Sequence, residues 1–188
     1  LAAAGIDMKQ AERELAAPAG EAIARIEHGP ISAARQAWAA ALGRLKVPQV
    51  DNPALGEDRL DLVDAQGTRH RLALRVLDDA PAADPLPQAV LAPAGPYGRV
   101  LEVVGATPAA QAAAAALAGR LWCLPWGTPG PLSVLQQLRG LDLPAQARLA
   151  RDLAGQAGAG DASFLDVAAC LAGIAPAWSG GPLTWSAA

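Results

Sequence analysis

The stretch Arg99-Val100-Leu101-Glu102-Val103-Val104, followed by Gly105-Ala106-Thr107-Pro108, decides the fold class. Residues 99–104 are mostly apolar and are typical of a strand. Thr107 can cap a helix whose first position is taken by Pro108, which predicts a helix over 109–118. A second apolar run over 121–124 predicts another strand. The whole segment is therefore typical of a βαβ unit.

A hairpin is predicted upstream of this unit. Residues 60–63 alternate in character, Asp64-Ala65-Gln66-Gly67 is typical of a turn, and residues 69–77 alternate again. A half-exposed strand is expected there, because its apolar and charged residues fall on opposite faces. The two faces carry Leu72, Leu74 and Val76 on one side and Arg71, Ala73 and Arg75 on the other.

The remaining segments predict a mixed α+β protein. A short strand is expected over 89–91, helices over 131–139, 144–157 and 162–173, and an irregular tail after them. We expect a small sheet of four or five strands with helices packed on it. The predicted division is a helical module over 1–48, a linker over 49–58 and an α/β domain over 59–188, which would dimerise or bind a partner or effector.

Helical spacing organises the first 48 residues. Ile23 and Ile26 mark the inner face of one predicted helix, which ends at Gly29-Pro30. Trp38, Leu42 and Leu45 recur at helical spacing on the next. The prolines after residue 46 then predict the linker, because each disfavours helix in the residue before it.

This segment resembles the helix-turn-helix domain of the Xre (phage-repressor-like) family. The residues that match the family order are Gln10, Ile23, Ile26, Glu27, Gly29, Leu42, Gly43 and Val47. The interval from Gln10 to Ile23 is one residue shorter than the family spacing. The resemblance implies duplex DNA as a ligand and a homodimer as the binding form. The DNA-contacting residues that it implies are Lys9, Gln10, Glu21, Arg25 and His28.

Composition limits the other function classes. The 188 residues carry a net charge of −3, which argues against a broad electrostatic footprint for nucleic acid. Cys123 and Cys170 lack Cys or His neighbours at metal-ligand spacing and lie in apolar stretches, so we expect buried reduced thiols and no metal or cofactor. Without a signal peptide or an apolar run of membrane-spanning length, we expect a cytoplasmic protein. A short piece is expected to precede Leu1, because the chain begins without Met.

No reaction can be assigned from the sequence. Neither His28 nor His70 has a nucleophile motif to pair with, and phosphate-loop patterns are absent. Residues 99–104 superficially resemble the Glu-x-Lys strand of restriction-endonuclease-like nucleases, but Glu102 is followed by Val103 and Val104, so a degenerate nuclease-like fold without activity is expected there.

Two hypotheses therefore remain for the function. The first is a bacterial, DNA-associated transcriptional regulator. The alternative is a non-catalytic interaction or adaptor protein, in which the helical module serves protein contacts. Trp178 and Trp185 in the tail are the candidate interface residues, because tryptophan is enriched at binding hot spots.

Overall fold

A computed structural model describes residues 23–29, 33–42, 45, 47–52, 54–95, 98–121, 123–128, 130–157 and 162–186. Its strands are β1 (Ile23–His28), β2 (Gln49–Asp51), β3 (Arg59–Val63), β4 (Arg69–Val76), β5 (Gln88–Gly95), β6 (Gly98–Val104) and β7 (Cys123–Thr128). Its helices are α2 (Ala33–Leu42), α3 (Pro108–Arg120), α4 (Val134–Leu138), α5 (Leu143–Ala157), α6 (Ala162–Leu171), the 3-10 turn η4 (Ala177–Ser179) and α7 (Pro182–Ser186).

The seven strands of the described residues form one mixed sheet in the order β2-β1-β3-β4-β5-β6-β7, so the predicted sheet of four or five strands was too small. The pairs β1/β2, β4/β5 and β6/β7 are parallel, whereas β1/β3, β3/β4 and β5/β6 are antiparallel. The mixed α/β class is confirmed. β1 and β2 come before residue 59, the predicted start of the α/β domain, yet they belong to the same sheet as the strands after residue 59.

The βαβ unit is confirmed as β6, α3 and the parallel strand β7. The Thr107 hydroxyl accepts the N–H of Ala110 at 3.3 Å, and Pro108 begins the helix, as the sequence predicts. The helix continues to Arg120, two residues beyond the predicted end, and β7 begins at Cys123 rather than at residue 121.

The hairpin is also confirmed. Leu60 pairs with Leu72 and Asp61 with Arg71 across β3 and β4, so the alternation of the two strands is in phase. The turn is held by Asp64, whose carboxylate accepts the N–H groups of Gln66 and Thr68. One face of the hairpin is therefore apolar, and the other carries charge.

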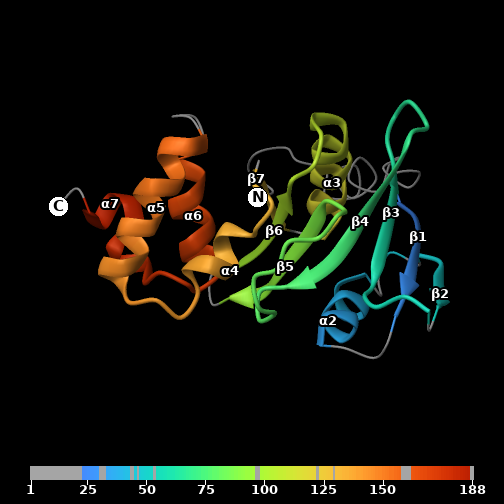
Figure 1. Cartoon of the computed structure of the whole chain (residues 1–188), viewed down its shortest axis with the longest axis horizontal. Coiled ribbons are helices and arrows are strands. Elements are labelled where there is room, and N and C mark those ends of the chain that lie inside the picture. Colours follow the sequence, from blue (N-terminus) through green and yellow to red (C-terminus); the bar gives the residue numbers. More distant parts are fainter. Residues whose placement is uncertain are drawn as a thin grey trace, which may run out of the picture.

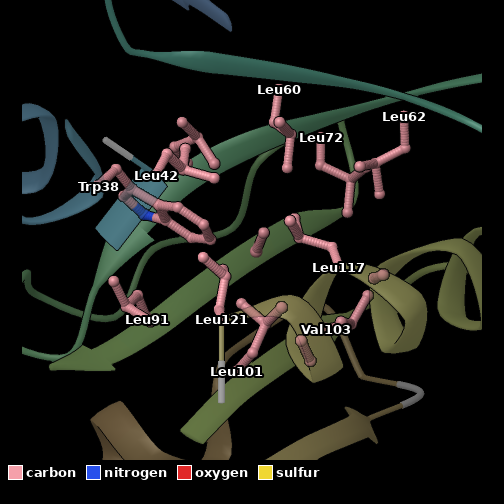
Figure 2. Close-up of a cluster of buried hydrophobic side chains, with 14 of the residues drawn as sticks. Trp38, Leu42, Leu60, Leu62, Leu72, Leu91, Leu101, Val103, Leu117 and Leu121 are labelled. Carbon is pink, nitrogen blue, oxygen red and sulfur yellow. The ribbon is translucent and has the colours of Figure 1, made fainter. Parts of the chain in front are cut away.

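The apolar face packs under α2 and α3 in the larger of two cores. Figure 2 shows Trp38 and Leu42 from α2 and Leu117 from α3 meeting leucines of the sheet. The Trp38 ring is completely buried, and its N–H donates to the carbonyl of Arg75 at 2.8 Å. The helical spacing of Trp38 and Leu42 is thus confirmed.

The opposite face of the sheet is divided between two environments. At β5–β7 it packs against the C-terminal helices through a second core that includes Val100, Trp126 and Leu135. Figure 1 shows α4–α7 gathered at one end of the molecule, with β1–β3 at the other. At β1, β3 and β4 the same face is charged.

The helix-turn-helix prediction is wrong for the described part of the N-terminal region. Residues 23–28, which the resemblance assigned to the recognition helix, form β1, paired with both β2 and β3. The register shifts between Ile23 and Arg25, which interrupts the period of two. Ile23 and Ile26 therefore stand three residues apart and imitate helical spacing. Residues 1–22 lie outside the described residues.

The predicted linker and the predicted tail need correction as well. Residues 49–51 form β2, and Asp58 is buried and accepts the N–H of Gly29 at 2.9 Å. In the tail, the Asp166 carboxylate of α6 accepts the N–H groups of Leu183 and Thr184, which fixes the start of α7. Side-chain acceptors distant in sequence organise both segments, so local patterns do not reveal them.

Candidate binding surface

Strand alternation places a charged surface on β1, β3 and β4, opposite the larger core. Around Asp61, the acidic groups lie low against the sheet and the arginines lie outermost. The Asp61 side chain is only 2% exposed, whereas those of Arg25, Arg69 and Arg71 are 41%, 59% and 40% exposed. We call this surface the arginine face; its residues are Arg25, Glu27, Arg59, Asp61, Val63, Arg69, Arg71, Ala73 and Arg75.

Three arginines converge on the Asp61 carboxylate. Arg71 binds it in a bidentate manner, with Nε to Oδ1 at 2.7 Å and Nη2 to Oδ2 at 3.0 Å. Arg25 approaches it through Nε at 3.4 Å, and Arg69 through Nη1 at 3.9 Å. Glu27 adds a second carboxylate, 2.5 Å from Nη2 of Arg25. These five residues, the Asp61 cluster, carry one more positive than negative charge.

The cluster alters the protonation of its own members. The hydrogen bonds from Arg71, together with the positive charges of Arg71, Arg25 and Arg69, lower the pKa of Asp61 although burial opposes them. The same hydrogen bonds raise the pKa of Arg71. Asp61 is therefore ionised at neutral pH, and it holds the guanidinium of Arg71 in a fixed orientation.

A neighbouring group on the same face is electrically balanced. Arg75 lies 2.8 Å from Glu57 and 3.5 Å from Asp84, and Arg59 lies 3.2 Å from Glu57 and 3.6 Å from Asp84. The side chains of Arg59 and Arg75 are only 17% and 14% exposed. The excess positive charge is thus confined to the outer part of the face, around Asp61.

Of the residues predicted to contact DNA, only Arg25 and His28 are described, and they lie on opposite faces of β1. Lys9, Gln10 and Glu21 lie outside the described residues. Arg25 belongs to the Asp61 cluster, on a strand rather than on a recognition helix. His28 is 2% exposed and lies on the opposite face of β1, so its imidazole is not presented to a ligand at the arginine face.

His28 instead joins three segments inside the protein. Its Nε2 lies 2.8 Å from Oε1 of Gln49 on β2, and its Nδ1 lies 3.5 Å from Oδ2 of Asp58. Asp58 also accepts the N–H of Gly29, so the carboxylate fixes the end of β1. Gly29 fits closely there, since a Cβ would lie 2.9 Å from the carbonyl oxygen of Leu55.

Glu102, the residue considered for a nuclease-like site, holds the second core to the sheet. Its fully buried carboxylate accepts hydrogen bonds from the hydroxyls of Thr128 and Ser133 and from the N–H groups of Val134 and Leu135. Burial raises its pKa, and these four donors act in the opposite direction. These four protein donors surround the carboxylate, and most of them lie at the start of α4.

No described residue set resembles a metal centre. Among the described residues, no group of three or more His, Cys, Asp or Glu side chains could hold a metal ion. Asp78 pairs with Arg139 at 2.7 Å, and Asp79 accepts the N–H of Val76 at 2.9 Å. These contacts do not bring either aspartate together with Glu102.

The two thiols and the described tail tryptophans differ in exposure. Cys123 is buried, which raises its pKa to about 11, whereas Cys170 is partly exposed, so the prediction of burial is right for the first only. Trp178 is 78% exposed on η4, and Trp185 on α7 is partly buried. Their role as an interface stays a prediction.

Sequence reasoning found part of the arginine face. The alternation of residues 69–77 placed Arg71 and Arg75 on an exposed face, opposite the leucines. Arg25 and Glu27 were missed as members because their segment was interpreted as helix. The signal that was available is the alternation Arg25-Ile26-Glu27-His28, in which charged residues occupy every second position.

Comparison with known proteins gives no relative: no protein-family model, no curated protein and no solved structure matches the chain. In particular, no match supports the resemblance to the Xre family. Among the described residues, no helix is long and apolar enough to span a membrane.

Proposed function

We propose that this chain is a non-catalytic interaction protein that binds a partner protein through the arginine face. The observation that carries the proposal is the layering of charge on that face. Three arginines are about half exposed above a carboxylate that is almost fully buried. Arginine suits protein interfaces because its planar guanidinium makes several directed hydrogen bonds.

The position of the face supports the same proposal. The C-terminal helices pack on β6 and β7, which leaves this half of the sheet presenting long charged side chains. A rigid sheet keeps such side chains at fixed spacing, so a partner meets a preorganised surface. The proposal includes no chemical step.

Site-specific photo-crosslinking tests this function. A photoreactive residue is placed at Arg69 on the arginine face and, as a control, at Arg148, which is exposed on α5. We expect a discrete crosslinked protein from position 69 only. The partner is then identified by mass spectrometry and purified, and its complex with the chain should be weakened by Arg25→Ala. Identical products from both positions, or none from position 69, would contradict the proposal.

Transcription regulation through duplex DNA is a second proposal. Of the residues implied for DNA contact, only Arg25 is described on an exposed surface. Anisotropy of a randomised duplex at low and moderate salt tests it directly. Binding that falls with salt and with Arg25→Ala would favour DNA, whereas no binding at low salt would remove this proposal.

Homodimerisation is likewise a proposal, with Trp178 and Trp185 as its interface residues. Trp178 is the most exposed of the large apolar side chains described, and Phe164 and Val167 on α6 are about half exposed. Sedimentation velocity of the wild type and Trp178→Ala tests it. A concentration-dependent dimer that the substitution weakens is expected, and a monomer at every concentration would refute it.

A further inference from the structure

We infer that the Asp61 cluster recognises an acidic protein segment, whose Glu or Asp carboxylates bind Arg25, Arg69 and Arg71. This inference rests on the proposed function and specifies the chemistry of the partner. The three guanidinium groups all lie within 4 Å of one carboxylate, so a single short segment can reach all of them. Their spacing is set by Asp61 rather than by the ligand.

Arg69 and Arg71 keep hydrogen-bond donors available for a ligand. A guanidinium has five N–H donors. Arg71 directs its Nε and Nη2 groups at Asp61, which leaves Nη1 without a contact to that carboxylate. Arg69 approaches Asp61 only through Nη1 at 3.9 Å and is the most exposed of the three. Arg69 is therefore the first contact for an incoming carboxylate, and Arg71 the most rigid one.

The net positive charge of the Asp61 cluster favours a negatively charged ligand. Arg25, Arg69 and Arg71 oppose only Glu27 and Asp61 in the cluster, and both acids are the less exposed groups, at 12% and 2%. A ligand above the face therefore meets positive charge first. One added carboxylate neutralises the cluster, and further carboxylates interact with arginines that Asp61 satisfies only in part.

The composition of the face favours an acidic peptide over nucleic acid. Single-stranded nucleic acids are held by bases stacked on aromatic side chains, and none of the nine residues of the arginine face is aromatic. Duplex DNA needs several neutralised phosphates, whereas the cluster has an excess of one charge and the chain a net charge of −3. A short segment with a few carboxylates matches this small excess.

The experiment measures binding of a fluorescent hexaglutamate peptide to the full chain by anisotropy, at low and at physiological salt. Hexaglutamine and a duplex DNA of random sequence are the comparison ligands. We expect saturable binding of hexaglutamate, weaker at the higher salt, and no binding of hexaglutamine. Arg69→Ala should raise the Kd about threefold to fivefold, which is the size of one exposed charge pair.

Arg148→Ala on α5 is the charge-matched control and should leave the Kd unchanged, since it removes one positive charge from another exposed surface. Arg71→Ala strands the buried Asp61 and can unfold the hairpin, so Arg71→Lys, which keeps the charge and loses the bidentate pair, is measured beside it. Circular dichroism shows which variants keep the native fold.

The outcomes separate this inference from the proposed function. Equal losses in Arg69→Ala and Arg148→Ala would overturn the inference, because binding would follow net charge only. So would binding of the duplex as tightly as hexaglutamate, which would identify nucleic acid as the ligand. If hexaglutamate does not bind while position 69 still crosslinks a partner, the acidic class is wrong and the proposed function stands. If hexaglutamate does not bind and position 69 crosslinks no partner, both this inference and the proposed function are wrong.

Discussion

At the scale of single residues, buried charges with many partners are the most consequential feature of this protein. Asp61 and Glu102 both lie on the face of the sheet opposite the larger core, one beneath arginines and the other beneath α4. A buried carboxylate without partners is costly, so each is stable only because donors surround it. Removing either the acid or its donors should therefore have large effects.

Asp61→Asn should lower the free energy of unfolding at pH 7 by about 1–3 kcal/mol, since hydrogen bonds to a charged group are lost. The pKa of Asp61 is lowered in the folded protein, mainly by Arg71. The stabilisation is therefore present above the unfolded pKa of about 3.9 and is lost as the pH falls through the folded pKa. Urea unfolding at pH 7 and at about pH 3 measures it. A difference between wild type and variant that does not shrink in acid would contradict this account.

Glu102→Ala should destabilise the protein by about 3–5 kcal/mol, because four buried donors lose their acceptor. Glu57→Ala is the matched control. Its side chain is 34% exposed, so its loss should cost about 1 kcal/mol or less. Chemical unfolding of both variants measures the difference. Similar costs for the two would show that the buried contacts of Glu102 are not special.

At the scale of elements, close contacts between segments determine how the C-terminal helices pack together. Gly181 has φ +106°, and a Cβ there would collide with the Asp166 side chain, which caps α7. Gly140 also has a positive φ, of +78°, but no atom lies within 4 Å of its would-be Cβ. Comparing the two glycines therefore distinguishes the cost of a positive φ from the cost of steric crowding.

Gly140→Ala should cost about 1 kcal/mol from its backbone conformation alone, and Gly181→Ala should cost at least about 2 kcal/mol, because the methyl group also displaces Asp166. Thermal unfolding followed by circular dichroism gives both values. Equal costs would mean that Asp166 moves aside freely and that α7 does not depend on it.

At the scale of the whole molecule, one sheet supports two cores on opposite faces. Leu117 lies in the core under α2 and α3, and Leu135 lies in the core beneath the C-terminal helices. Since β5 and β6 contribute side chains to both cores, disruption of one should affect the other.

Leu117→Ala and Leu135→Ala should each lower the free energy of unfolding by about 2–5 kcal/mol, as is usual for a fully buried leucine. In both variants we expect one unfolding transition, with the same midpoint by tryptophan fluorescence and by far-ultraviolet circular dichroism. Two separate midpoints in either variant would show that the cores unfold independently.

The elements that could be predicted from sequence are those with undisturbed local patterns. The alternation around Leu72 and the cap formed by Thr107 and Pro108 identified β4 and α3, because these signals need no distant partner. β1 was missed because a register shift beside Arg25 disturbs its period, and β2 because three residues are too few to show one.

The order of the strands and the Asp61 cluster were beyond the reach of sequence for a different reason. β1 pairs with β3, and β4 lies parallel to β5, so these neighbours are fixed by tertiary packing rather than by spacing. Arg25 reaches Asp61 only through the first of these pairings. A correct strand assignment for residues 23–28 alone would not have located the surface.

The two outermost strands bear on how this protein behaves at high concentration. β2 is only three residues long, and β7 carries the exposed Pro125, which has no N–H to offer to another strand. A sheet whose borders are short or interrupted is a poor template for fibril growth. Pro125→Val would remove that protection, and we expect faster fibril formation from the variant in a thioflavin assay.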